Sequence, residues 1–138
     1  MQDGYPRTIQ QAKDLDKIQK IDKVLNIILP LHVLMAKMLA RRVCVDCGRG
    51  YNLANIQEGE LDMPPLLPKP SDCEKCVGKP NLIQRDDDKE DIVKARFDIY
   101  EKQTSPLIAY YQAQTKLQDF HVKKGLDDTP RLFHELQI

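Results

Sequence analysis

Two Cys-x-x-Cys pairs are the residues of this sequence whose types and spacing most directly predict chemistry. The pairs contain all four cysteines of the 138-residue chain: Cys44, Cys47, Cys73 and Cys76. Each pair places two thiolates on one side of a tight turn, and two such turns supply the tetrahedral set of sulfur ligands that zinc prefers in structural sites. We therefore expect the four cysteines to bind one structural zinc ion.

Other states of the cysteines remain open from the residues alone. The segment between the pairs, residues 48–72, is longer than in the most compact zinc ribbons, but the entropy cost of loop closure grows only slowly with length. Reduced thiols without a metal are one alternative, and disulfide or redox chemistry is another. No signal peptide is visible, and a thioredoxin-like site requires only one Cys-x-x-Cys motif, so the metal site is favoured.

Arginines flank the two cysteine pairs closely. Arg41 and Arg42 precede the first pair, and Arg85 follows the second and leads into the aspartates at 86–88. A guanidinium group matches phosphate oxygens with its fork of N–H donors. A single surface arginine is usually only a solvated charge or half of an ion pair. Arginines at both ends of one metal-bound flap, in contrast, indicate a segment that handles phosphate groups.

The overall composition excludes several classes of partner. The chain carries 21 basic and 21 acidic residues, so no overall positive field is available to hold nucleic acid or an anionic membrane. The longest apolar run, 24–39, is interrupted by Asn26, Pro30, His32 and Lys37, which makes it too polar for a transmembrane helix. We expect one soluble, intracellular domain with no nucleic-acid partner and no membrane insertion.

Local patterns predict helices that alternate with two strands. Thr8 with Gln11 three residues later is typical of a helix start, and this helix should reach about Lys20. The near-continuous apolar run 24–29 ends at Pro30 and predicts a fully buried, central strand of a parallel sheet. The other expected elements are helices over about 32–42 and 86–103, helices from 106 and 129, a strand near 120–122, and a proline-rich excursion at 44–82.

The amino-terminal residues resemble a known signature. The run Asp3-Gly4-Tyr5-Pro6-Arg7-Thr8-Ile9-Gln10-Gln11-Ala12 is similar to the Asp-Gly-[Phe/Tyr]-Pro-Arg-Thr-x-x-Gln-Ala motif of adenylate kinases. Further motifs follow in the order of that family: Arg41-Arg42-Val43-Cys44, the two cysteine pairs, Arg85-x-Asp87-Asp88, Val93-Lys94-Ala95-Arg96 and Thr104-x-Pro106-Leu107-Ile108-x-Tyr110-Tyr111. The resemblance spans nearly the whole chain.

The resemblance implies a fold. It is an α/β fold, a partial P-loop nucleoside monophosphate kinase core in which helices flank a parallel sheet. Residues 1–42 and 85–138 would form the core, and residues 43–84 would form a four-cysteine, zinc-ribbon-like lid.

The resemblance also implies roles for the arginines. Arg41, Arg85 and Arg96 would surround the transferring phosphoryl group, with Arg42 as an auxiliary. Asp87 and Asp88 would orient these arginines at the end of the lid. On the AMP side, Arg7 would bind the phosphate and Gln11 the adenine, although Gln11 can equally serve as the helix-capping residue.

Two further residues concern the ATP side. Lys37, with Arg41, would bind ATP; Lys37 stands where the family usually has an arginine that stacks on the adenine, and it lacks the planar guanidinium group. On the helix expected over 32–42, Lys37 and Arg41 would share one face. Asp3 matches an aspartate near the magnesium ion and its waters, so Mg²⁺ with ATP is an expected cofactor.

The activity implied by the resemblance is reversible phosphoryl transfer, ATP + AMP = 2 ADP. Such catalysis depends on in-line positioning and on fixed positive charge around the transferring group. The sequence contains no Gly-x-x-x-x-Gly-Lys-[Ser/Thr] phosphate loop. We therefore expect the carboxy-terminal part of an adenylate kinase, binding ATP, AMP and ADP when complete but not competent alone.

Two alternatives remain open. One is a degenerate adenylate-kinase-like structural subunit of a larger assembly, and the other is an independent zinc-binding module. If the chain is part of an adenylate kinase or a structural subunit, a missing amino-terminal segment or a partner protein completes the sheet. The long lid insertion resembles organellar, plant-type adenylate kinases, which favours a mitochondrion or plastid.

Overall fold

The computed structural model describes residues 4–69, 72 and 81–137 and divides into two compact units. The first unit contains Met1–Ile28 and Lys94–His121, and the second contains Leu29–Val93 and Val122–Ile138. Across the described residues, no helix is both long enough and apolar enough to cross a membrane.

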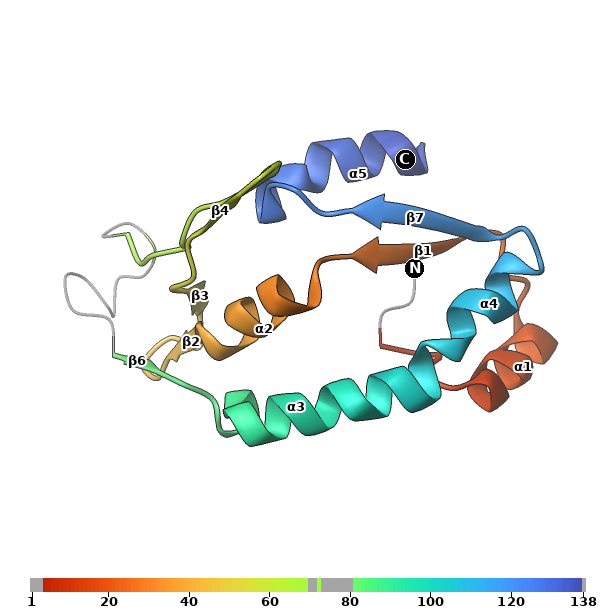
Figure 1. Ribbon diagram of the computed structural model, residues 1–138, viewed down its shortest axis with the longest axis horizontal. Helices are drawn as coiled ribbons and strands as arrows, with labels where there is room; N and C mark the ends of the chain where they lie inside the picture. Colours follow the sequence, from red (N-terminus) through yellow and green to blue (C-terminus); the bar gives the residue numbers. More distant parts are fainter. Residues whose placement is uncertain (1–3, 70–71, 73–80, 138) are drawn as a thin grey trace. The chain divides into compact units, whose positions relative to one another are not determined.

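The first unit is built on two parallel strands, β1 (Val24–Ile28) and β7 (Leu117–His121), which lie side by side in Figure 1. Val24 pairs with Leu117 at one end of the register. The helices α1 (Ile9–Ile18) and α4 (Pro106–Gln112) belong to the same unit. Its buried cluster contains Ala12, Leu107 and Tyr111, with Ile9, Val24, Tyr110 and Leu117 packed against them. The predicted α/β fold with a parallel sheet and helices is confirmed.

The predicted full burial of the first strand is wrong. Ile27 is 61% exposed, and the other residues of β1 are half-buried. The reason is that β7 is the only strand bonded to β1 among the described residues, and helices do not cover every side chain of a two-stranded sheet. The parallel direction was predicted correctly. The second predicted strand, 120–122, corresponds to β7, which begins three residues earlier and ends at His121.

The predicted start of the first helix is confirmed. Thr8 is the N-cap of α1, and its hydroxyl accepts a hydrogen bond from the Gln11 amide over 3.2 Å. The helix ends at Ile18, slightly before the expected Lys20, and Gln19 is the C-cap. A side-chain acceptor at this position satisfies one of the amide groups that a helix start leaves without a partner.

The helical segment expected at 86–103 changes pitch along its length. It comprises the 3₁₀ turn η2 (Asp86–Asp88), the helix α3 (Glu90–Ile99) and the π-helical turn η3 (Tyr100–Thr104), which leads into α4. The Ser105 amide donates to the Tyr100 carbonyl over 2.8 Å, five residues back. Pro106 has no N–H group, and its ring needs room near the preceding turn, so a wider turn suits its position.

The second unit contains α2 (Leu31–Leu39) and a three-stranded antiparallel sheet. The sheet has the order β3 (Gly50–Asn52), β2 (Arg41–Cys44) and β6 (Leu82–Ile83). The prediction that the second helix reaches Arg42 is wrong, because α2 ends at Leu39. Arg41 and Arg42 pair instead with Asn52 and Tyr51 across β2 and β3, so Lys37 and Arg41 do not share a helix face.

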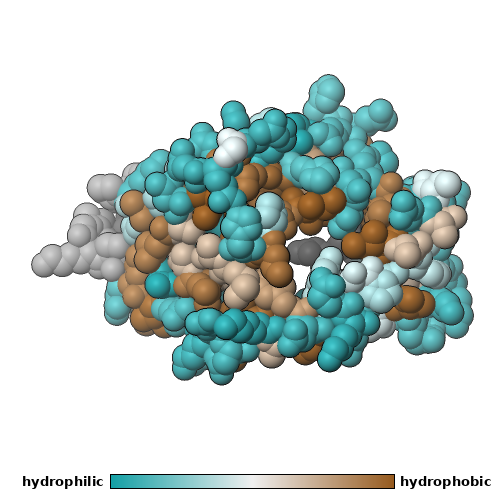
Figure 2. Space-filling model, in the orientation of Figure 1, coloured by the Kyte–Doolittle hydropathy of each residue, from teal (hydrophilic) through white to brown (hydrophobic). Residues whose placement is uncertain are grey.

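Short elements complete the second unit. The hairpin of β4 (Ile56–Glu58) and β5 (Leu61–Met63) agrees with the prediction that prolines deny this excursion long elements. The 3₁₀ turn η4 (Gly125–Asp128) leads into α5 (Thr129–Leu136), which begins at the predicted residue. Figure 2 shows apolar as well as polar side chains on the visible surface, and Leu126 is among the exposed apolar residues.

Candidate functional site

An arginine–aspartate pair with a buried carboxylate lies where β2 begins. The Arg41 Nε donates to Asp88 Oδ2 over 2.7 Å, and a terminal guanidinium nitrogen donates to Oδ1. Asp88 is fully buried, whereas the Arg41 side chain is 35% exposed. The hydrogen bonds to Asp88 raise the pKa of Arg41, although partial burial acts in the opposite direction. This two-point contact fixes the guanidinium plane and keeps it charged.

A second arginine–aspartate pair, Arg85 with Asp87, lies in the residues just before Asp88. Arg85 Nη2 contacts Asp87 Oδ2 at 3.0 Å, and both side chains are about half exposed. Gln84 connects this segment to the end of α2, since its amide donates to the carbonyls of Asp88 and Leu39 at 2.9 and 3.2 Å. The structure thus brings Arg41 and Arg85 each into contact with one aspartate of the same 3₁₀ turn, η2.

The Arg42 side chain contacts the carboxyl-terminal end of α2 rather than an aspartate of η2. One of its terminal guanidinium nitrogens donates to the carbonyls of Leu39 and Arg41 over 2.9 and 2.7 Å. These carbonyls lie at or just beyond the carboxyl terminus of α2, where carbonyls lack intrahelical partners and a cation is favoured. Arg42 therefore acts as a helix-capping group in this structure.

The predicted AMP-side residues lie at the amino terminus of α1, in the first unit. Arg7 Nε donates to the Gly4 carbonyl over 2.9 Å, and Thr104 Oγ1 donates to the Arg7 carbonyl over 2.9 Å. The Gln11 side chain accepts a hydrogen bond from the Arg7 amide over 2.8 Å, which is close to the capping role. Gly4 has a φ of +76°, and an added Cβ would lie 3.3 Å from an Arg7 nitrogen. Gly4 and Thr104 thus position Arg7, a role that sequence reasoning missed.

Arg96 lies on α3 and belongs to the first unit with Arg7, whereas Arg41 and Arg85 belong to the second. Asp3, Cys73 and Cys76 lie outside the described residues.

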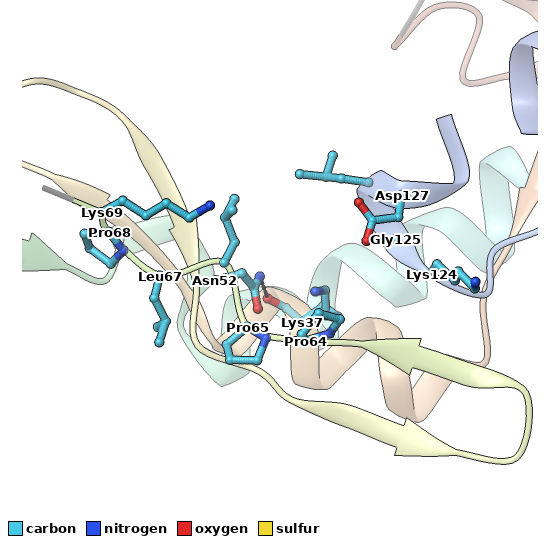
Figure 3. Close-up of a pocket in the computed structure, with 12 residues that line it drawn as sticks. Lys37, Asn52, Pro64, Pro65, Leu67, Pro68, Lys69, Lys124, Gly125 and Asp127 are labelled. Atoms are coloured by element: carbon cyan, nitrogen blue, oxygen red, sulfur yellow. Dashed lines mark hydrogen bonds between the residues drawn. The ribbon is translucent and has the colours of Figure 1, made fainter. Parts of the chain in front are cut away.

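A cavity of about 550 Å³ lies within the second unit (Figure 3). Its lining comes from α2, β3, the proline-rich loop and the turn before α5: Lys37, Asn52, Pro64, Pro65, Leu66, Leu67, Pro68, Lys69, Lys124, Gly125, Leu126 and Asp127. This volume lies within the range of about 300–1,000 Å³ typical of small-molecule sites. The prolines and leucines offer apolar surface, and the lysines and Asp127 offer charge.

Lys37 is the lining residue that sequence reasoning had singled out. Partial burial lowers the pKa of its amine. The Lys37 carbonyl accepts a hydrogen bond from Asn52 Nδ2 over 2.8 Å, drawn as a dashed line in Figure 3, and Asn52 Oδ1 accepts from the Ala54 amide over 3.1 Å. Asn52 therefore joins the wall of α2 to the loop that follows β3.

The segment Lys124–Asp127 is a part of the cavity wall that sequence reasoning missed. Its sequence signal is a glycine that follows two lysines and comes shortly before two aspartates and a helix start. Gly125 has a φ of +65°, a backbone conformation that favours glycine.

The first cysteine pair has a backbone that suits metal binding. Cys44 ends β2 and is buried, and the Gly48 amide donates to its carbonyl over 2.8 Å. Gly48 has a φ of +72°, which closes the turn behind Cys47. Both thiols therefore sit on one tight turn, as metal-binding pairs require.

The segment after the second cysteine pair returns to the first. Leu82 pairs with Cys44 across β6 and β2, and the Val45 amide donates to the Asn81 carbonyl over 3.0 Å. Among the described residues no group of three or more His, Cys, Asp or Glu side chains could hold a metal ion. Cys44 and Cys47 lie on one turn among the described residues, and binding of zinc by the four cysteines stays a prediction.

Comparison with known proteins decides the family. The adenylate kinase family model matches residues 1–116. The chain belongs to the adenylate kinase family. It is 42% identical over 127 residues to a GTP:AMP phosphotransferase of Plasmodium falciparum, which covers 91% of this chain and 55% of that protein. The family predicted from the motifs is therefore confirmed.

Two other relatives show similar coverage. Adenylate kinase 1, chloroplastic, of Arabidopsis thaliana is 41% identical over 143 residues, covering 99% of this chain and 48% of the relative. An adenylate kinase of Acetivibrio thermocellus is 43% identical over 134 residues, covering 94% and 57%. The chain spans about half the length of the relatives it matches.

Proposed function

We propose that this chain is the carboxy-terminal part of an enzyme that catalyses ATP + AMP = 2 ADP. The observation that carries the proposal is the pair of Arg41 with the buried Asp88, which holds a fixed cation four residues after Lys37 of the cavity wall. A nucleotide whose base occupied the cavity would need such a cation for its phosphates. Membership of the adenylate kinase family supports the same reaction.

In the proposed reaction the γ-phosphoryl group of ATP moves to a phosphate oxygen of AMP. The bond to the β-phosphate oxygen breaks as the new P–O bond forms, and two molecules of ADP result. Arg41, Arg85 and Arg96 would stabilise the charge on the transferring group. Asp88 and Asp87 would orient Arg41 and Arg85, with which they are paired in the structure.

The two nucleotides would be bound by different groups. Arg7 would hold the AMP phosphate, Gln11 would contact its adenine, and Lys37 would line the site of the ATP base. Asp3 would lie near Mg²⁺, which enters with ATP and neutralises phosphate charge. Arg42 would contribute through the end of α2 rather than through a nucleotide contact.

The proposed lid comprises residues 43–84 between the core segments 1–42 and 85–138. Cys44, Cys47, Cys73 and Cys76 would hold a structural zinc ion that keeps the lid folded while it closes over the nucleotides. The described turn at Cys44 supports this assignment.

Catalysis would require more polypeptide than this chain. The sequence contains no phosphate loop, and the exposed Ile27 on β1 favours further polypeptide packed against the sheet. The completing part would be the amino-terminal segment of the same enzyme. Chloroplastic relatives and the long lid favour a plastid, or else a mitochondrion, as its compartment.

A second candidate is a structural subunit that has lost activity. The lysine at position 37, where an arginine is usual, favours this candidate, because lysine cannot stack on a base as arginine does. In that case another protein would complete the sheet. The independent zinc module is disfavoured because the chain belongs to the adenylate kinase family.

Completion by a relative tests the proposal. Residues 1–138 alone, and the same residues joined to the amino-terminal half of the Acetivibrio thermocellus relative, would be assayed for ADP formation from ATP and AMP. We expect turnover only from the joined protein. A joined protein that folds and binds both nucleotides but gives no turnover would favour the structural subunit.

A further inference from the structure

Asp128 has a buried carboxylate with four hydrogen-bond donors around it. The residue is only 6% exposed. Its Oδ2 accepts hydrogen bonds from the backbone amides of Lys123 and Lys124, both over 2.7 Å. Its Oδ1 accepts from Arg131 Nε at 3.2 Å and from Arg131 Nη2 at 2.9 Å. The side chain thus closes residues 123–128 into one loop before α5.

The same loop is attached to the β4–β5 hairpin on its other side. The Asp62 amide donates to the Lys123 carbonyl over 2.9 Å, and the Lys123 amine contacts Glu60 Oε2 at 2.8 Å. Gly125 lies against the buried Met63, whose Cγ would be 3.8 Å from a Cβ added to the glycine. The backbone of Lys123 is therefore held from both sides, at its amide by Asp128 and at its carbonyl by Asp62.

Four consecutive residues of this loop, Lys124–Asp127, line the cavity of the second unit. Figure 3 shows Lys124, Gly125 and Asp127 on a different part of the chain from Lys37 and from the proline-rich loop. We propose that Asp128 is a positioning residue for the donor-nucleotide cavity, which holds Lys124–Asp127 in the conformation that forms one wall. The proposal rests on the proposed function only in naming the ligand as a nucleotide.

The carboxylate cannot be replaced by its closest amide analogue without losing contacts. All four neighbouring groups are N–H donors, and a carboxylate offers acceptors on both oxygens. Asparagine has nearly the same shape but presents an NH₂ group on one side, which would face either the backbone amides or Arg131. Burial alone raises the pKa of Asp128, but the amides of Lys124 and Lys123 and the Arg131 side chain lower it overall, so the group stays ionised at neutral pH.

Two variants test the proposal in the 138-residue chain. Asp128→Asn removes acceptors from the loop, and Glu60→Gln is the matched control, because it changes an exposed contact of the same loop and leaves the Asp128 contacts intact. Amide hydrogen exchange of Lys123 and Lys124 would be measured without nucleotide. ATP and AMP carrying a methylanthraniloyl fluorophore on the ribose would then be titrated with each variant.

We expect Asp128→Asn to accelerate exchange of the two amides about tenfold and to raise the Kd for labelled ATP about tenfold, the factor that one lost hydrogen bond to a charged group produces. The affinity of Asp128→Asn for labelled AMP should stay within about twofold of wild type. The affinities of Glu60→Gln for both labelled nucleotides should also stay within about twofold. Arg131→Gln leaves the Oδ2 contacts in place, so it should raise the exchange rates and the Kd for labelled ATP by a smaller factor. This variant replaces Asp128→Asn in the test if Asp128→Asn does not fold.

Three outcomes would overturn the proposal. They are unchanged amide exchange in Asp128→Asn, unchanged affinity for labelled ATP, and an equal loss of affinity for ATP and AMP, which indicates general destabilisation. If the wild-type chain does not bind labelled ATP, the titrations are repeated in the joined protein, and absence of ATP binding there counts against the proposed function instead. In that case the exchange measurement alone decides whether Asp128 holds the loop.

Discussion

The two arginine–aspartate pairs, Arg41–Asp88 and Arg85–Asp87, have the same chemistry but different surroundings. Arg41 pairs with Asp88, which is fully buried and contacts the guanidinium group at two points. Arg85 pairs with Asp87 at one point of contact, and both side chains are about half exposed. Burial and contact geometry, rather than residue type, therefore distinguish a fixed cation from an adjustable one.

The difference suggests a division of roles. A guanidinium group fixed at two points needs no reorganisation when charge develops on a phosphoryl group, which favours electrostatic stabilisation. A guanidinium group held at one exposed point can leave its partner at little cost. We expect Arg41 to be positioned before nucleotides bind and Arg85 to move on binding.

Metal removal should produce the largest effect. Ligation of four thiolates contributes several kcal/mol to folding, on the order of that in small zinc domains. Chelation should therefore loosen the proposed lid, residues 43–84. β6 is held to β2 by only two residue pairs, whereas β2 also pairs with β3. Amide exchange should therefore increase more at Leu82 and Ile83 than at Arg42 and Val43. Equal protection with and without chelator, or no zinc bound to the purified chain, would contradict the zinc assignment.

Asp88→Ala should have the next largest effect. It leaves the partly buried Arg41 without its carboxylate, which we expect to cost about 3 kcal/mol of unfolding free energy. Asp87→Ala, the matched change at the exposed pair, should cost less than about 1 kcal/mol. Urea denaturation of both variants measures the difference. Similar losses in the two variants would show that burial does not separate the pairs.

Lowering the pH should have a smaller effect on stability through Asp128, a third carboxylate that accepts hydrogen bonds. Since the pKa of Asp128 is lowered in the folded chain, its contribution to stability is present above its unfolded value of about 4 and is lost as the pH falls below it. The difference in unfolding free energy between wild type and Asp128→Asn should therefore shrink between about pH 5 and pH 2. A difference that stays constant over this range would argue against an ionised Asp128.

Local sequence signals predicted the features that depend on neighbouring residues. The cap formed by Thr8 and Gln11, the helix start at Thr129 and the tight turn at Cys44 all involve residues within a few positions of one another. The family was predictable for a different reason, because several motifs occurred in the right order.

Long-range contacts account for what the sequence did not predict. The apolar pattern of 31–39 continues toward Arg42, but pairing of β2 with residues 50–52 ends the helix first. The burial of Asp88 depends on Arg41, 47 residues away. The loop that carries the cavity wall Lys124–Asp127 is attached to a hairpin about sixty residues earlier, and its local pattern of glycine and charges does not show which cavity it lines.

The most direct test of the account is the turnover number of the joined enzyme when its flap-end arginines are changed. Arg41→Ala and Arg85→Ala should each lower kcat by about a hundredfold or more and change KM much less, because their charge matters most in the transition state. Lys89→Ala is the control, since Lys89 forms an exposed ion pair with Asp86 of the same turn. Its kcat should stay within about twofold of wild type. Wild-type kcat in both arginine variants would contradict the proposed role of the pairs in phosphoryl transfer.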